Sequence, residues 1–285
     1  MTRQENSAWF NTQQIDSNLY LTTEKQFFEG NRSNIWLIRG PARDLIIDCG
    51  LGVCNLKTHL ENLQLLDSNR ECIVLCTHVH FDHSGGAKHF ENTNQIFIHQ
   101  DDYQGLINGR QVDTLNYVKP NHFFQEPYEN FSARNYRVLP TKCEPILDGH
   151  QIDLGAGDEV IIKHVPGHTR GSIVCYYPKE RSLFTGDFVY NCGHGGDLFD
   201  WLPTSSVRDY LRSANQMIDW LDENEIDRIY PGHFRILNEK NRVRELLQQY
   251  VDSKDDCCSR LTVACLQTLT SGFFRAGCFR CCPCG

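Results

Sequence analysis

Short apolar runs separated by turn-forming residues dominate the first third of the chain and predict β-strands. The predicted strands cover residues 34–38, 45–48, 72–76 and 95–99. The first two flank residues 40–44 (Gly-Pro-Ala-Arg-Asp), whose turn chemistry predicts a β-hairpin. Residues 72–76 are apolar throughout, which is typical of a fully buried strand. Residues 56–66 have helical spacing, whereas residues 100–145 lack a clear period, so we expect loops and short helices there.

The second half of the chain again alternates strands with helices. The predicted strands cover residues 160–164, 173–177, 182–185 and 227–230, and the predicted helices cover 205–221 and 239–251. Strands followed by helices, twice over, indicate two similar halves packed sheet against sheet with helices outside, an α+β architecture. Because no low-complexity linker precedes residue 252, we expect one domain at residues 1–251 and a cysteine-rich tail at 252–285.

The overall composition excludes some classes of function. The net charge of −8 implies no general affinity for nucleic acid. Residues 1–7 lack the basic and apolar regions of a signal peptide, and no run of about 18 apolar residues predicts a membrane-spanning helix. Without a secretory signal, we do not expect a disulfide framework, although the chain has 14 cysteines and seven of them crowd the last 29 residues.

Residues 78–83 form the most informative stretch, because they place three imidazoles and a carboxylate within six positions. The four side chains are those of His78, His80, Asp82 and His83. Imidazole nitrogen and carboxylate oxygen are donors that a divalent ion such as zinc prefers. The stretch directly follows the apolar strand at 72–76, so it lies on a loop at a strand's carboxyl end, where α/β folds commonly place active sites.

Three later segments share one design, in which a strand ends in a tight turn that presents a polar side chain. The turns are Pro166-Gly167-His168, Thr185-Gly186-Asp187 and Pro231-Gly232-His233. Glycine lets the backbone turn sharply, so the next side chain can point across the strand ends. Together with the loop at 78–83, these turns supply seven donor side chains, which are enough for two metal ions.

From Trp9 to Val251 the chain resembles the metallo-β-lactamase superfamily, on the His-x-His-x-Asp-His motif and the three later turns. The resemblance implies an αββα sandwich of four layers, with two metal ions in a cleft along one edge of the sheets. The implied cofactor is two zinc ions, with iron or manganese as alternatives. Carried over by position, the implied ligands are His78, His80 and His168 for one ion, Asp82, His83 and His233 for the other, and Asp187 as the bridge.

The same resemblance implies a role for Asp48, and the chemistry of a two-metal centre suggests one for Asp82. Asp48, at the end of the strand at 45–48, is expected to orient the ligand loop. Asp82 is expected to act in catalysis as well, by orienting the attacking water and shuttling its proton. Two divalent ions about 3.5–4 Å apart can lower the pKa of a shared water towards about 7.

The position of Asp187 helps to select a branch of the superfamily. Many zinc β-lactamases have a cysteine at the comparable point, so antibiotic hydrolysis is disfavoured. The ligand set resembles the glyoxalase II type of thioester hydrolase, although the helical glutathione-binding domain of that type has no counterpart. A closer resemblance, to an acyl-coenzyme A thioesterase family, rests on residues 30–37, 77–86, 166–173 and 200–203. It implies hydrolysis of long-chain acyl-coenzyme A, such as palmitoyl-coenzyme A, to a free fatty acid and coenzyme A.

Three other functions stay open at this point. One is a glyoxalase II-type hydroxyacylglutathione hydrolase, the second is an iron-dependent persulfide dioxygenase, and the third is a non-enzymatic binding protein that kept the fold. The substrate contacts also stay open. Phe199 and Trp201 are candidates for the floor of an acyl groove. The alternative for Trp201 is that it anchors its loop in the core. Arg170 either meets a phosphate or carboxylate or is an ordinary surface residue, and His194 lies in a glycine-rich loop that can border a cleft.

The last 29 residues combine basic charge, phenylalanines and clustered cysteines, and contain no acidic residue. This composition suits a segment on the anionic cytoplasmic face of a membrane, with the endoplasmic reticulum favoured by the family resemblance. Cysteines in such a segment are candidates for S-palmitoylation, with a structural zinc site as the alternative. The candidate cysteines are Cys257, Cys258, Cys265, Cys278, Cys281, Cys282 and Cys284. The sequence does not predict the oligomeric state.

Overall fold

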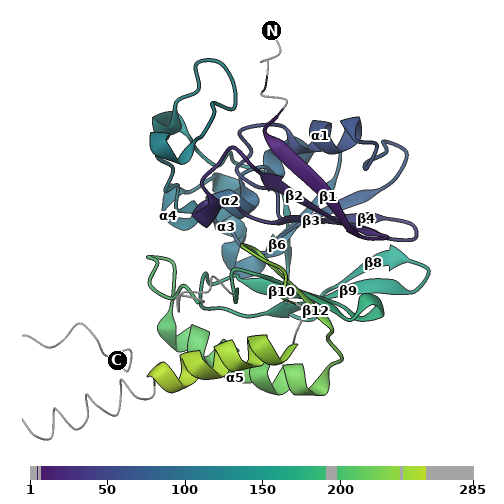
Figure 1. The fold of residues 1–285 in the computed structure, drawn as a ribbon, viewed down its shortest axis with the longest axis vertical. Helices are drawn as coiled ribbons and strands as arrows, with labels where there is room; N and C mark the ends of the chain where they lie inside the picture. The colour runs from purple at the N-terminus through teal and green to yellow at the C-terminus, as the bar shows by residue number, and fades with distance from the viewer. Residues whose placement is uncertain (1–4, 6–7, 191–197, 238–239, 255–285) are drawn as a thin grey trace, which may run out of the picture.

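Two β-sheets face each other and are flanked by helices on their outer sides in the computed structural model, which describes residues 5, 8–190, 198–237 and 240–254 (Figure 1). This is the four-layer α+β sandwich expected from the sequence. The seven cysteines from Cys257 to Cys284, His194, and the tail beyond residue 254 lie outside the described residues. None of the helices in the described ranges combines the length and apolar character needed to cross a membrane.

The first sheet has seven strands in the order of the chain, β1 to β7. They are β1 Phe10–Asp16, β2 Leu19–Glu24, β3 Ile35–Arg39, β4 Asp44–Ile47, β5 Cys72–Cys76, β6 Gln95–His99 and β7 Glu144–Ile146. Strands β1 to β4 pair antiparallel, and β4 to β7 pair parallel. The parallel pairing brings the carboxyl ends of β4 and β5 to the same edge of the sheet, which is where the His-rich loop begins.

The second sheet has five strands in the order β12-β11-β10-β9-β8. They are β8 Gln151–Gly155, β9 Asp158–His164, β10 Ile173–Tyr177, β11 Ser182–Gly186 and β12 Arg228–Pro231. The last two strands pair parallel, so the turns that follow β11 and β12 leave the sheet side by side. The other neighbouring strands of this sheet pair antiparallel.

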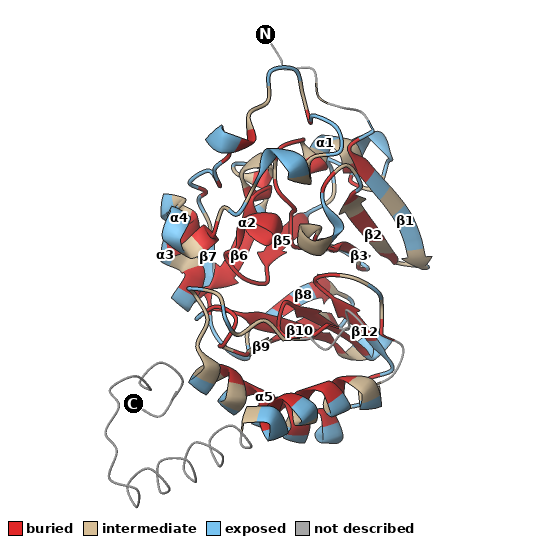
Figure 2. Ribbon diagram, turned by 60° about the vertical axis from the view of Figure 1, so that its left-hand side comes forward, coloured by how far each residue is buried: buried red, intermediate tan, exposed pale blue. Residues whose placement is uncertain are grey.

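The helices pack on the outer faces of the two sheets. They are α1 Leu56–Asn62, α2 Phe81–Ser84, α3 Gln100–Asn108, α4 Gln111–Thr114 and α5 Val207–Glu223, followed by a helix at residues 240–254. Single 3₁₀ turns occur at Glu29–Asn31, Ala87–Phe90, Pro120–His122, Ala133–Asn135 and Pro178–Glu180. In α5 the buried side chains recur at helical spacing and face the second sheet, whereas its outer face is exposed (Figure 2).

The continuous apolar strands are explained by burial on both faces. In β3, Ile35 and Leu37 join the core beneath the outer helices, whereas Trp36 and Ile38 join the core between the two sheets. Successive side chains of a strand point to opposite faces, so a strand covered on both sides needs apolar residues throughout. The same reasoning applies to β5, all of whose residues are buried.

Four strands were not predicted from the sequence, and the reasons differ between them. Strand β1 is mostly polar with only Phe10 buried, β2 directly follows it, and β7 has three residues. Strand β8 does alternate, with Ile152 and Leu154 buried between exposed neighbours, but it is short and ends in glycine. The helix predicted at 56–66 is shorter and ends at Asn62.

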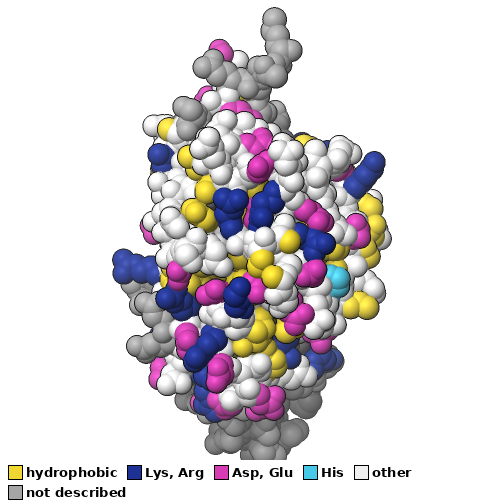
Figure 3. Space-filling view, turned by 90° about the vertical axis from the view of Figure 1, so that its right-hand side faces the viewer, with side chains coloured by type: hydrophobic (Ala, Val, Ile, Leu, Met, Phe, Trp, Pro, Cys, Tyr) yellow, Lys and Arg dark blue, Asp and Glu magenta, His cyan; other side chains and the backbone are white. Residues whose placement is uncertain are grey.

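Basic and acidic side chains are interspersed on the face of the molecule shown in Figure 3. That face therefore presents no broad surface of one charge, of the kind that binds a nucleic-acid backbone.

Candidate metal centre

The seven donor side chains predicted from the sequence lie together at the edge of the sandwich, and all of them are buried. Residues 78–83 follow β5 directly, and the second half of this stretch belongs to the short helix α2. The other three donors follow strands of the second sheet: His168 follows β9, Asp187 follows β11, and His233 follows β12. The site is therefore shared by the two sheets.

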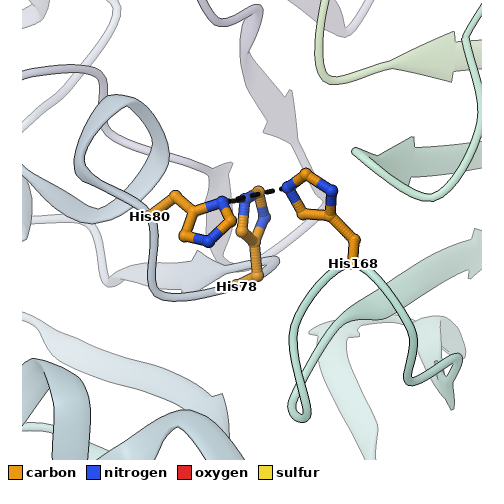
Figure 4. Close-up of side chains that lie close together, drawn as sticks. All are labelled: His78, His80 and His168. Carbon is orange, nitrogen blue, oxygen red and sulfur yellow. Dashed lines mark hydrogen bonds between the residues drawn. The ribbon is translucent and has the colours of Figure 1, made fainter. Parts of the chain in front are cut away.

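Three imidazoles form a compact group at one end of the site (Figure 4). The distance from His78 Nε2 to His80 Nδ1 is 3.1 Å, and that from His168 Nε2 to His80 Nδ1 is 2.9 Å. A tetrahedral cation with metal–nitrogen bonds of about 2.0–2.1 Å separates its ligand nitrogens by roughly 3.3 Å. The three nitrogens are therefore spaced closely enough to share one cation.

A second group adjoins the first. His83 Nε2 lies 3.0 Å from His233 Nε2, and Asp82 Oδ2 lies 3.6 Å from the same His233 nitrogen. Asp187 is in reach of both groups, because its Oδ1 lies 3.1 Å from His83 Nε2 and its Oδ2 lies 3.5 Å from His168 Nε2. Asp187 thus lies between the two groups.

Each imidazole also makes a hydrogen bond through the ring nitrogen that points away from the centre. This bond determines which nitrogen carries the proton and which has a free lone pair. His168 Nδ1 donates to the backbone carbonyl of Phe199 at 3.0 Å, and His233 Nδ1 donates to that of Arg32 at 3.0 Å. A carbonyl oxygen only accepts, so the proton must sit on Nδ1. In the neutral form of each ring, the inward Nε2 is then the nitrogen with the free lone pair that metal binding requires.

Asp48 orients two of the imidazoles. Its Oδ2 accepts from His83 Nδ1 at 2.8 Å and from Thr77 Oγ1 at 2.9 Å. Because the Thr77 hydroxyl donates to Asp48, its lone pair is free to accept from His78 Nδ1, which lies 3.1 Å away. His80 has a similar partner, since its Nε2 lies 2.9 Å from the Thr204 hydroxyl. All five imidazoles of the two groups are therefore held by specific partners on their outward nitrogens.

Burial and charge in the site also suit a cation. Burial, together with the neighbouring imidazoles, lowers the pKa of His78 and His80 well below the usual range, so both are neutral. Burial opposes the ionised form of Asp187, but the imidazoles of His233 and His83 hold the pKa of this carboxyl well below its usual range. Burial opposes the charged forms of His83 and His233, but the nearby Asp187 carboxylate raises the pKa of both, so a cation bound there would replace a proton. The neutral imidazoles of His78 and His80 and the ionised carboxylate of Asp187 are donors suited to a divalent metal ion.

Residues 33 and 34 account for part of the motif noted at 30–37. The Ser33 hydroxyl donates to the backbone carbonyl of Asp82. Asn34 Nδ2 donates to the carbonyls of Pro231 at 2.9 Å and Phe234 at 3.0 Å, on either side of His233. These two polar side chains thus fix the backbone of both loops that carry donors of the second group.

A cleft of about 240 Å³ opens onto the donors. Its lining is rich in aromatic and aliphatic side chains, namely Phe81, Leu115, Tyr117, Tyr190, Phe199, Trp201 and Leu202. Trp201 lines the cleft and is 70% exposed, so it does not anchor its loop in the core. Arg170 is exposed and is not among the residues that line the cleft, so the structure does not bring it to the donors.

Several residues of the site carried no signal in the sequence. Thr204 lies 124 positions from His80 and is brought to it only by the packing of the sheets. Asp102 lies in a stretch expected to form loops and short helices, yet its buried carboxylate accepts hydrogen bonds from Val79 and Thr169, in the loops that carry His78, His80 and His168. A single polar residue in a loop or helix start is too common to single out without the fold.

Comparison with known proteins gives the following relatives. The sequence profile described as "Metallo-beta-lactamase superfamily" matches residues 29–233. The "Acyl-coenzyme A thioesterase MBLAC2" of Gallus gallus is 33% identical over 269 residues, which cover 92% of this chain and 94% of that protein. The protein of the same name from Homo sapiens is 33% identical over 273 residues, with the same coverage. The "Probable metallo-hydrolase MJ0888" of Methanocaldococcus jannaschii is 31% identical over 213 residues, covering 73% of this chain and 90% of that one.

Solved structures agree with the fold. The metallo-beta-lactamase family protein TTHA1429 from Thermus thermophilus superposes with a TM-score of 0.62 at 21% identity, covering 86% of this chain and 82% of that chain. The DIM-1 metallo-beta-lactamase superposes with a TM-score of 0.57 at 20% identity, covering 84% and 97%. TTHA1623, crystallised in a di-iron-bound form, superposes with a TM-score of 0.53 at 20% identity, covering 74% and 92%. At these identities the likeness concerns the fold alone.

Proposed function

This chain belongs to the metallo-β-lactamase superfamily, and we propose that it is a dinuclear metal hydrolase that cleaves the thioester of long-chain acyl-coenzyme A. The observation that carries the proposal is the convergence of five buried imidazoles and two buried carboxylates in two adjoining groups. Alignment along 92% of the chain with proteins named acyl-coenzyme A thioesterase supports the choice of substrate.

The donors suit two divalent ions, and we propose zinc. His78, His80 and His168 would hold one ion, Asp82, His83 and His233 would hold the other, and Asp187 would contact both. Such ions, when bound, supply an activated water and polarise the carbonyl under attack. Imidazole and carboxylate ligands also accept iron or manganese, so the metal requires direct analysis.

The chain's own residues would position the reaction. Asp82 belongs to the donor set and also lines the cleft, so its carboxylate faces the space where a water and a carbonyl would meet. We assign it the role of orienting the water and receiving its proton. A thiolate leaving group, with a pKa of about 8.5, departs at neutral pH with little protonation, so a thioester does not need the general acid that an amide requires.

The lining of the cleft supports an acyl chain as the substituent on the carbonyl. Phe199 and Trp201 pack edge to face with ring centroids 5.9 Å apart, and Leu115 and Tyr117 also line the cleft. Each methylene group that such a wall removes from water is worth about 0.8 kcal/mol. The cleft volume of about 240 Å³ is below the range of roughly 300–1,000 Å³ that is usual for ligand sites, so a long chain would extend past its mouth over the exposed face of Trp201.

Side-by-side assays of thiol release test this function. We expect release of coenzyme A from palmitoyl-coenzyme A to be faster than from acetyl-coenzyme A, and faster than turnover of S-lactoylglutathione or nitrocefin. Activity should disappear with a chelator and return with about two zinc ions per chain. The absence of thiol release at every chain length would refute the proposal, and one iron per chain with oxygen consumption on a persulfide would establish the dioxygenase instead.

A variant of Trp201 tests the acyl wall. In Trp201→Ala we expect kcat/KM for palmitoyl-coenzyme A to fall roughly tenfold, with a smaller change for acetyl-coenzyme A, because about two methylenes lose their contact. Phe124→Ala is the matched control, since Phe124 is a 60% exposed aromatic residue that does not line the cleft. An equal loss for both chain lengths in Trp201→Ala would exclude an acyl-binding role for this side chain.

Association with a cytoplasm-facing membrane, of which the endoplasmic reticulum is favoured, also stays a proposal. It rests on the composition of residues 257–285, which lie outside the described residues. Acylation of these cysteines is testable by thioester-specific labelling in cells. We expect wild-type protein in the membrane fraction, and a variant with all seven cysteines of this segment replaced by serine in the soluble fraction.

A further inference from the structure

The carboxylate of Asp102 is buried where the two halves of the sandwich meet. Asp102 lies in the first turn of α3, is only 6% exposed, and accepts three hydrogen bonds. Its Oδ2 accepts from the backbone N–H of Val79 at 3.0 Å and from the Thr169 hydroxyl at 2.7 Å. Its Oδ1 accepts from the backbone N–H of Gly171 at 3.0 Å. A buried carboxylate with three donors is held in one position.

The donors to Asp102 adjoin ligands of one cation only. Val79 lies between His78 and His80, and Thr169 directly follows His168. These three histidines form the group of imidazoles described first, yet they come from loops of different sheets. A single carboxylate thus joins the two loops on which this group depends.

Gly171 shows how close the contact is. A Cβ atom at this position would lie 2.6 Å from Asp102 Cγ, which is nearer than side chains approach each other. The loop after His168 can therefore approach the carboxylate only because residue 171 is glycine. The direct contact between Asp102 and this loop therefore depends on the residue type at position 171.

We propose that Asp102 is a positioning residue that sets the separation between the His78–His80 pair and His168, and thereby the affinity of the cation that these histidines hold. The inference rests on the metal centre proposed above but not on the choice of substrate. Among the described residues, none of those that adjoin Asp82, His83 or His233 in the chain donates a hydrogen bond to the Asp102 carboxylate. Loss of the Asp102 contacts should therefore weaken one cation selectively.

The variant Asp102→Asn tests this role with little change in shape. An amide keeps one acceptor oxygen, and its NH₂ group must then face the N–H of either Val79 or Gly171, which breaks one link whichever way it turns. Asp227→Asn is the matched control, because it is the same substitution at an aspartate whose side chain is 53% exposed and pairs with Arg181. Among the described residues, Asp227 belongs to none of the groups that could hold a metal ion, whereas Asp101 adjoins His99 and His164 in such a group. Asp227 precedes β12, at the opposite end of that strand from His233.

The measurement is competition between the metal-free chain and a chromophoric chelator for zinc, without any substrate. His80→Ala and His233→Ala, each lacking one ligand of one group, assign the two binding steps. In Asp102→Asn we expect the step assigned to His78, His80 and His168 to weaken roughly 10- to 100-fold and the other to stay within about threefold, with both steps unchanged in Asp227→Asn.

Two results would overturn the inference: wild-type affinity for both ions in Asp102→Asn, or an equal weakening of both steps, which general loosening of the fold would produce. If Asp102→Asn does not fold, as judged by circular dichroism, Thr169→Val tests the same role, since it removes only the hydroxyl that donates to Asp102. A selective loss of roughly threefold to tenfold at the same step supports the role, and unchanged steps refute it. A wild-type chain that binds no metal would refute both the metal centre and this inference, whereas metal binding without thioesterase activity would refute only the substrate.

Discussion

Replacing Asp48 with asparagine changes the protonation of a predicted ligand without changing the shape of the site. Asp48 Oδ2 accepts from His83 Nδ1 at 2.8 Å, and Oδ1 accepts from the backbone N–H of Thr77 at 2.8 Å. An asparagine side chain has only one acceptor oxygen for these two donors. The backbone tolerates the change, because Asp48 has φ of 64° and asparagine adopts this left-handed region readily.

The expected magnitude follows from the mismatch. If the new NH₂ group faces His83, the ring must place its proton on Nε2, the nitrogen that lies 3.1 Å from Asp187 Oδ1 at the centre of the site. That nitrogen then has no lone pair for a cation. If the amide turns the other way, the N–H of Thr77 is left unmatched. Either mismatch costs about 1–3 kcal/mol, which corresponds to roughly a 5- to 150-fold loss of affinity.

The assay is zinc content after equilibrium dialysis at limiting free zinc, together with initial rates of thioester cleavage. Asp48→Asn should lose the cation held by His83, whereas Thr77→Val, which removes the hydroxyl next to His78 Nδ1, should affect mainly the other cation. Two zinc ions bound to Asp48→Asn with affinities within about threefold of wild type would refute the tautomer argument.

Three further outcomes are expected. Zinc at about 100 times its dissociation constant should raise the melting temperature of the metal-free chain by about 5–10 °C in a thermal-shift assay, and no rise would contradict the metal centre. Asn34→Ala should weaken the cation near His233 roughly 10-fold in the same chelator competition, because the carbonyls on either side of His233 lose their common donor. Burial raises the pKa of Glu24 from 4.5 to about 7, so the folded protein binds more protons than the unfolded chain between these values. The free energy of unfolding should therefore gain up to about 3 kcal/mol from this group as the pH falls from 8 to 5, and urea titrations of Glu24→Gln that show the same gain would contradict this.

Much of the architecture was predictable because it depends on local patterns. Strands buried on both faces must be apolar along their whole length, so β3, β5 and β10 are visible in the sequence. A strand at the edge of a sheet does not need apolar residues along its whole length, and the largely polar β1 was missed. Burial therefore made β3, β5 and β10 recognisable, whereas β1, β7 and β8 at the edges of the sheets were missed.

The donor residues were also predictable, because each follows closely on a strand that the sequence reveals. Three histidines and an aspartate within residues 78–83 are typical of a metal-binding loop, and the glycine turns before His168, Asp187 and His233 place those side chains at strand ends. The identity of the donors is thus contained in short segments, each of which can be recognised on its own.

The arrangement of these donors was decided by the tertiary structure alone. Asp102 joins loops separated in the chain by more than 60 positions, Thr204 reaches His80 across 124, and Trp201 lines an open cleft and is not part of the core. Hydrogen bonds between distant segments depend on how two sheets pack, and no local pattern encodes that packing. The sequence by itself determined which atoms are available to hold metal ions, whereas the packing of the sheets decided which nitrogen of each imidazole faces the centre and what holds it there.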